Sequence, residues 1–188
     1  MPYNIPRMKS IQRLHQIQVH DEMPSSFVVV DLETTGLNPR SDKIVEIAIL
    51  TVENGEVVDV FDTLVNPGIM IPFAASRVNN ITDDMVRGEP PFESLIPKIL
   101  ALLDGKIVTG YNVTFDIGFL DQAFYDIGLI IDEMPFFDVL DIVRRKIPYG
   151  RTPNHKLETM KHFFGIQMVS HRAGDDCRIT VEVLKKVL

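Results

Sequence analysis

The stretch Phe27-Val28-Val29-Val30-Asp31-Leu32-Glu33-Thr34-Thr35-Gly36 decides how this chain folds. Four apolar and mostly β-branched residues predict a buried strand, and this strand runs directly into two carboxylates. Because side chains alternate between the two faces of a strand, Asp31 and Glu33 point to the same side. Acids are also common at the solvated end of a strand, so this pair indicates a site only if other segments contribute to it.

Two further strands continue from this stretch as an antiparallel meander. Residues 43–52 predict the second strand, Asn54-Gly55 is a strong hairpin signal, and residues 56–65 return as the third strand. Strand and helix patterns then alternate, which predicts an α/β fold with a mixed sheet. Short strands are expected at 107–109 and 136–139, and helices at 92–103, 116–127, 156–164 and 173–188. Pro97 implies that the first of these helices is kinked or starts nearer Leu95 than Phe92.

Residues 1–26 form an extension in front of the main domain, which covers residues 27–188. Apolar residues recur there at a helical spacing, which predicts a short amphipathic helix docked on the main domain. The alternative is a contact for a partner or for nucleic-acid phosphates. The residues of this pattern are Met8, Ile11, Leu14 and Ile17.

Composition narrows the class of protein. No apolar run approaches the roughly 20 residues of a membrane span, and the N-terminus lacks a secretory signal, so no membrane partner is expected. Cys177 is the only cysteine, and a reducing, cytoplasmic location is the simplest interpretation. The net charge of −7 argues against coating nucleic acid with a broad basic surface. It is compatible with local binding of a strand, above all where bound cations reverse the sign of the site.

Two other segments place acids at the ends of predicted elements. Asp116 follows a buried strand at the start of a helix, and Asp176 lies in the first turn of the last helix. His171 is five residues before Asp176, or about 140° around a helix. If both act at one site, His171 must therefore lie before the helix, on a segment that can fold back.

Converging carboxylates repel one another unless cations neutralise them. Divalent cations such as Mg²⁺ or Mn²⁺ prefer oxygen ligands of this kind. Two such ions roughly 3.5–4 Å apart suit displacement at phosphorus, because they stabilise the attacking and the leaving oxygen. A nearby histidine can take the proton from water.

These three motifs in this order resemble the DEDD superfamily of 3′–5′ exonucleases, in its histidine-containing (DEDDh) branch. Asp31-Leu32-Glu33-Thr34-Thr35-Gly36 matches the first motif, Asn112-Val113-Thr114-Phe115-Asp116 the second, and His171 with Asp176 the third. The chain is similar to the proofreading epsilon subunit of bacterial DNA polymerase III and to exonuclease domains fused to polymerases. The resemblance implies a ribonuclease-H-like fold over residues 27–188, which agrees with the predicted meander.

The resemblance also implies residue roles. Asp31, Glu33, Asp116 and Asp176 would hold two divalent cations, Mg²⁺ or Mn²⁺, and His171 would be the general base. Substrate-binding residues carried over by position are Thr34, Thr35, Leu37, Asn112 and Phe115, with Val78 as an opposite wall. Tyr111 departs from the histidine that is frequent in this group, which puts the substrate preference in question.

The predicted function is metal-dependent 3′–5′ hydrolysis of single-stranded DNA ends, releasing nucleoside 5′-monophosphates, for proofreading or end trimming. A DNA polymerase is a possible partner. The alternatives are an exoribonuclease for small RNA or mixed substrates, and a non-catalytic nucleic-acid- or polymerase-binding module. A basic run allows two interpretations, a solvated helix end or a phosphate-binding rail for the incoming strand; it comprises Arg144, Arg145, Lys146 and Arg151.

Overall fold

A computed structural model describes residues 15–19, 21–131, 134–169 and 171–188. Its centre is a six-stranded sheet with the strand order β1-β6-β5-β2-β3-β4. The strands are β1 (His15–Gln16), β2 (Ser26–Thr34), β3 (Ile44–Glu53), β4 (Glu56–Leu64), β5 (Val108–Gly110) and β6 (Pro135–Asp138).

The antiparallel meander predicted from the sequence forms β2, β3 and β4. β2 pairs antiparallel with β3, and β3 with β4, while β5 runs parallel to β2 and β6 parallel to β5. Asn54 and Gly55 make the β3–β4 turn with φ of 50° and 81°, the left-handed backbone that such a tight hairpin requires. The sheet is therefore mixed, with β2 between its antiparallel and parallel halves.

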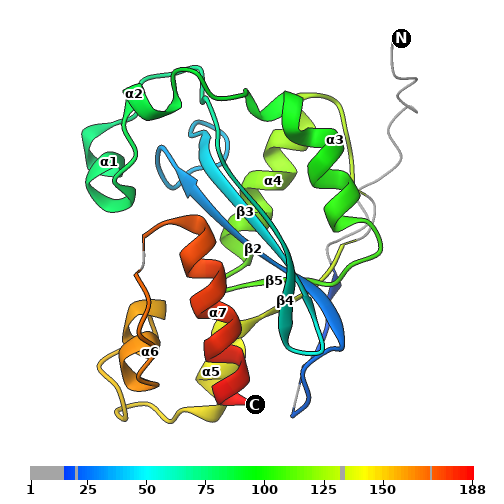
Figure 1. The fold of residues 1–188 in the computed structure, drawn as a ribbon, viewed down its shortest axis with the longest axis vertical. Helices are drawn as coiled ribbons and strands as arrows, with labels where there is room; N and C mark the ends of the chain where they lie inside the picture. Colours follow the sequence, from blue (N-terminus) through cyan, green and yellow to red (C-terminus); the bar gives the residue numbers. More distant parts are fainter. Residues whose placement is uncertain (1–14, 20, 132–133, 170) are drawn as a thin grey trace.

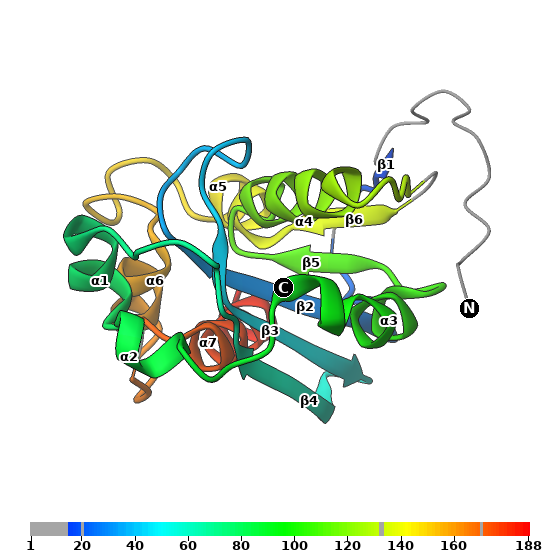
Figure 2. The same cartoon turned by 90° about the horizontal axis from the view of Figure 1, so that it is seen from above.

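Helices cover both faces of this sheet, as Figures 1 and 2 show. α3 and α4 pack on one face, where the β2 side chains of Val28 and Val30 join their core. α5 and α7 pack on the other face, where Phe27 and Val29 lie. The helices are α1 (Phe73–Asn79), α2 (Asp83–Val86), α3 (Phe92–Leu103), α4 (Thr114–Asp126), α5 (Val139–Lys146), α6 (Leu157–Phe163) and α7 (Ala173–Val187).

The main differences between the observed helices and the sequence expectations concern α3, α4 and α1. α3 begins at Phe92 and continues through Pro97, so the expected later start near Leu95 is wrong. Pro97 has no N–H to donate to the carbonyl of Glu93, four residues earlier in the helix. Glu93 is exposed, so water can donate this hydrogen bond instead. α4 begins at Thr114, two residues before the expected start, and α1, in which only Asn79 is buried, is a helix that the sequence pattern does not predict.

The N-terminal extension joins the sheet where the structure describes it. His15 and Gln16 pair parallel with β6, and the Ile17 N–H donates to the Phe136 carbonyl at 2.8 Å. The predicted helix is therefore wrong at Ile17, and its remaining positions, 8, 11 and 14, lie outside the described residues. Within the described part of the chain, no helix has the length and apolar character needed to cross a bilayer.

Candidate active site

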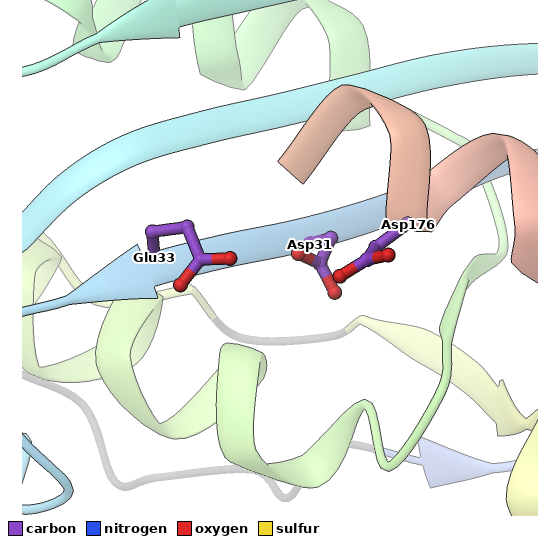
Figure 3. A group of neighbouring side chains, drawn as sticks. All are labelled: Asp31, Glu33 and Asp176. Carbon is purple, nitrogen blue, oxygen red and sulfur yellow. The ribbon is translucent and has the colours of Figure 1, made fainter. Parts of the chain in front are cut away.

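Three carboxylates meet at the end of β2, on the face covered by α7. Asp31 and Glu33 come from β2, and Asp176 comes from the first turn of α7. One carboxylate oxygen from each lies within 4.8 Å of the others. Figure 3 shows the carboxyl groups of Asp31 and Asp176 side by side, with that of Glu33 further along the same strand. Strand alternation and the α7 packing together produce this cluster, which we call the carboxylate cluster.

Asp116, the fourth predicted acid, lies beside the carboxylate cluster and is held by the backbone of β2. It is 3% exposed, and its Oδ1 accepts a hydrogen bond from the Leu32 N–H at 3.0 Å. That N–H is available because β5 ends at Gly110 and does not pair with β2 beyond Val29. A Cβ on Gly110 would lie 2.6 Å from the Val30 carbonyl oxygen, so only glycine allows this close approach.

Burial and mutual repulsion raise the pKa of the acids of this site. Burial raises the pKa of Asp31 well above its ordinary range, and the charges of Asp116 and Asp176 add to the shift. Burial and Asp176 raise the pKa of Glu33 to about 7. Burial raises the pKa of Asp176 to about 6, although a hydrogen bond from the His171 N–H opposes the rise. Each of these carboxyl groups therefore keeps its proton to a higher pH than an ordinary acid does, an effect that a bound cation would reverse.

His171 lies directly before α7, as the five-residue spacing required. Its backbone N–H faces the carboxylate of Asp176, at 3.4 Å from Oδ1 and 3.3 Å from Oδ2. The residue is exposed and has a φ of 72°, a left-handed backbone that is uncommon outside glycine. The chain thus folds back at His171 and keeps this residue next to Asp176.

A buried ion pair that the sequence analysis missed fixes the start of α7. Glu46 of β3 is fully buried; its carboxylate accepts hydrogen bonds from Arg172 Nε at 2.8 Å and from the Ala173 N–H at 3.0 Å. An Arg172 Nη2 contact completes the pair. The available signal was a single acid inside the apolar run of residues 44–52, because a buried charge requires a partner.

The second motif is positioned by another acid, Asp138. Its Oδ1 caps α5 through the Leu140 N–H and also accepts the Asn112 N–H, both at 2.9 Å. Asn112 is exposed and has a φ of 65°. Phe115 is half-buried, with its ring 5.0 Å from that of Phe119. Asn112 is therefore accessible to a ligand, whereas Phe115 offers only part of its ring.

The predicted substrate residues after β2 differ in accessibility. Leu37 is 84% exposed, but Thr35 is 3% exposed and its hydroxyl oxygen accepts the Lys43 N–H at 2.9 Å. The strand register shifts between Glu33 and Thr34, which interrupts the alternation. Thr35 therefore turns its hydroxyl into its own loop, and its contact with the terminal nucleotide stays a prediction.

Thr34 is the last residue of β2, and Val78 lies on α1. Thr34 donates its hydroxyl to the Gly36 carbonyl at 2.6 Å. Val78 is 63% exposed on α1. Its neighbour Asn79 is buried and donates its side-chain amide to the Thr34 carbonyl at 3.4 Å. α1 is thus tied to the end of β2, and Val78 is the exposed apolar residue there.

The donor set fits a hard divalent cation. The carboxylate cluster offers only oxygen ligands, which Mg²⁺ and Mn²⁺ prefer. The charge of Arg172 lowers the pKa of Glu33, but its guanidinium is hydrogen-bonded to Glu46. The excess of negative charge in the carboxylate cluster is therefore left for metal to neutralise.

Comparison with known proteins identifies the family. The sequence profile of a family described as "Exonuclease" matches residues 28–184. The chain belongs to the exonuclease family. It is 33% identical over 171 residues to a DNA polymerase III PolC-type protein of Clostridium perfringens, covering 90% of this chain and 12% of that protein. It is also 33% identical over 168 residues to the 3′-5′ exonuclease DinG of Bacillus subtilis, covering 86% of this chain and 18% of that protein.

Solved structures of exonucleases share the fold. Exonuclease X, in complex with 5′ overhanging duplex DNA, superimposes with a TM-score of 0.67 at 26% identity, over 86% of this chain and 90% of that one. E. coli Exonuclease I with a dT13 oligonucleotide gives a TM-score of 0.78 at 22% identity, over 87% of this chain and 41% of that one.

The predicted DEDD exonuclease resemblance and the ribonuclease-H-like fold class are therefore confirmed. The predicted enzyme class, exonuclease, is confirmed with them. The chain spans less than a fifth of the length of the DNA polymerase III and DinG relatives.

Proposed function

We propose that this domain hydrolyses single-stranded DNA from its 3′ end and releases nucleoside 5′-monophosphates. The observation that carries the proposal is the convergence of Asp31, Glu33 and Asp176 within 4.8 Å, in a chain of the exonuclease family. DNA is favoured over RNA because the structural neighbours were solved with DNA. Proofreading or end trimming beside a DNA polymerase is the proposed task, since the relatives include polymerase III proteins. A cytoplasmic location is the matching expectation.

In this proposal the acids and the histidine have separate tasks. Asp31, Glu33, Asp116 and Asp176 hold two divalent cations, Mg²⁺ or Mn²⁺. When bound, the cations supply electrostatic stabilisation of the attacking and leaving oxygens. His171 takes one proton from the attacking water, whose oxygen bonds to phosphorus while the bond to the 3′ oxygen of the preceding nucleotide breaks. The residues that contact the terminal nucleotide are Thr34, Thr35, Leu37, Val78, Asn112 and Phe115.

The position of His171 supports its assignment as the base. A general base must reach the water that attacks, which requires a side chain at the edge of the metal site and open to solvent. The backbone N–H of His171 faces Asp176 while the residue itself is exposed.

The direct test is digestion of end-labelled strands with Mn²⁺ and with EDTA. The proposal expects one-nucleotide shortening of single-stranded DNA from its 3′ end, blocked by a 3′-phosphate and unaffected by a 5′-phosphate. Asp31→Asn should abolish the activity, whereas Asp59→Asn, which removes an exposed acid from β4, should not. Equal cleavage of a circular single strand would exclude an exonuclease. A preference for RNA ends would replace DNA as the substrate, and no metal-dependent cleavage would leave the non-catalytic alternative.

A further inference from the structure

A concave surface lies beside the second motif, apart from the carboxylate cluster. It has a volume of about 980 Å³ and is formed by the loop between α5 and α6 together with the ends of β5 and α5. We call it the loop groove; its lining includes Asn112, Arg144, Tyr149, Arg151, His155 and Lys156. None of these residues belongs to the carboxylate cluster.

The loop groove adjoins the candidate active site through Asn112. This residue lines the groove, and it precedes Asp116 by four residues at the start of α4. Tyr111 donates its hydroxyl to the His155 carbonyl at 2.5 Å, which ties the loop to the end of β5. In Figure 2 the loop between α5 and α6 lies at the same end of the sheet as the loop after β2. The loop groove therefore lies beside the second motif, at the same end of the sheet as the loop after β2.

The charge of the loop groove is opposite to that of the chain. Arg144, Arg151 and Lys156 are exposed, and none of the described residues that line the groove is acidic. Arg144 forms an ion pair with Asp141 at 3.3 Å, and the guanidinium of Arg151 lies over the Phe163 ring. Because the chain carries a net charge of −7, a concavity with three cations is a local site for a polyanion.

An aromatic side chain stands at the edge of these cations. Tyr149 is 96% exposed, so packing does not account for its ring, and the ring lies 5.5 Å from that of His155. Unpaired bases stack on such side chains, whereas a base within a duplex does not expose its face. Cations and an exposed ring together are the combination that binds a single strand.

We propose that the loop groove binds the single strand on the 5′ side of the nucleotide being removed. Arg144, Arg151 and Lys156 contact its phosphates, and Tyr149 stacks on one of its bases. The proposal rests on the proposed function, because it assigns the path of the same substrate. It also selects between the two interpretations of the basic run: Arg144 and Arg151 line the groove, whereas Arg145 donates to the Val19 carbonyl and Lys146 pairs with Asp21.

Binding without catalysis is the first test. The affinity for a labelled dT12 strand is measured by fluorescence anisotropy in EDTA over a series of NaCl concentrations. For the double variant Arg144→Ala/Arg151→Ala we expect the slope of log Kd against log [NaCl] to fall by about 1.4, roughly 0.7 for each lost phosphate contact. Tyr149→Ala should bind about tenfold more weakly and Tyr149→Phe like the parent, because phenylalanine keeps the stacking ring. Lys98→Ala, which removes an exposed cation from α3, is the matched control.

Catalysis on two substrates separates the groove from the active site. The 4-nitrophenyl ester of thymidine 5′-monophosphate carries one nucleotide and cannot reach the groove. With Mn²⁺, the Arg144→Ala/Arg151→Ala variant should hydrolyse this ester like the parent, while its kcat/KM on dT12 should fall at least tenfold. A parent that hydrolyses neither substrate refutes the proposed function, and the binding measurement in EDTA then decides the groove alone.

Three results overturn the assignment of the groove. The first is that the arginine and Tyr149→Ala variants bind dT12 like Lys98→Ala, as they would if the groove served a protein partner. The second is that the double variant loses hydrolysis of the ester to the same degree as that of dT12. The third is that Tyr149→Phe loses as much affinity as Tyr149→Ala, since the ring would then not be the element that binds.

Discussion

Removing Arg172 should destabilise the domain more than removing its partner Glu46. In Arg172→Ala, the Glu46 carboxylate stays fully buried and keeps only the hydrogen bond from the Ala173 N–H. Breaking a buried pair in this way costs about 3–5 kcal/mol of unfolding free energy. The Arg172 side chain is 42% exposed, so water reaches the vacated space and the lower end, about 3 kcal/mol, applies.

Glu46→Gln removes the buried partner of the pair and leaves the exposed one. Glutamine has a similar shape, removes the buried charge and keeps an oxygen for the Ala173 N–H. Arg172 then loses its partner but remains in contact with water. We expect a loss of about 1 kcal/mol or less, the scale of one hydrogen bond. At about 2–4 °C per kcal/mol for a domain of this size, the melting temperature should fall by roughly 6–12 °C in Arg172→Ala and 2–4 °C in Glu46→Gln.

Thermal unfolding of the parent, both single variants and the double variant tests this order. The runs contain saturating Mn²⁺, so that the carboxylate cluster contributes equally to every protein. The double variant has no buried charge and should melt above Arg172→Ala, a positive coupling between the two positions. The reasoning is refuted if Glu46→Gln is destabilised as much as Arg172→Ala, or if the double variant melts below both single variants.

Three further predictions concern the acids and the base. Asp31→Asn removes one charge from the carboxylate cluster, so in EDTA this variant should melt at a higher temperature than the parent and than Asp59→Asn. In excess Mn²⁺ this difference in melting temperature should become smaller or change sign. An unchanged or lower melting temperature of Asp31→Asn in EDTA would contradict the clustering. In the native chain the pKa of Glu33 is raised from 4.5 to about 7 and that of Asp176 from 3.8 to about 6. At a pH between the lower and the raised pKa of each group, the native chain therefore binds more protons than the unfolded chain. The metal-free chain should therefore lose stability as pH rises from about 4.5 to 7, and denaturant titrations at several pH values that show a gain would contradict the shifts. His171→Ala should lose about 10²–10⁴ in turnover while Mn²⁺ binding and melting temperature are kept, and near-normal turnover across neutral pH would mean that the base lies elsewhere.

The sequence predicted the elements whose cause is local. The Phe27–Gly36 stretch and Asn54-Gly55 determine strand, turn and register within a few residues, and the structure agrees with them. The spacing of His171 and Asp176 predicted that His171 lies before the helix if both act at one site, and α7 begins at Ala173. Such predictions succeed because period and turn chemistry act over neighbouring residues.

Features that depend on distant segments were not predictable in this way. Glu46 and Arg172 are 126 residues apart, and nothing local to either residue names the other. The orientation of Thr35 depends on a register shift against β3, so the alternation that correctly placed Asp31 does not extend to it. His15 and Gln16 pair with β6, a strand 119 residues or more away in the sequence, so no local pattern indicates this pairing.

The acids around this site divide into two kinds, and the division explains how repelling charges can be held together. Asp116, Glu46 and Asp138 each accept a backbone N–H, from Leu32, Ala173 and Asn112 respectively, in a segment distant in sequence. These bonds fix α4, α7 and the second motif relative to the sheet without any metal. Asp31 and Glu33 extend from the strand that these elements enclose. Their mutual repulsion therefore does not displace the surrounding elements, because the hydrogen bonds of the other carboxylates hold those elements in place. Loss of metal should therefore change the protonation of the carboxylate cluster more than the positions of the elements that carry it.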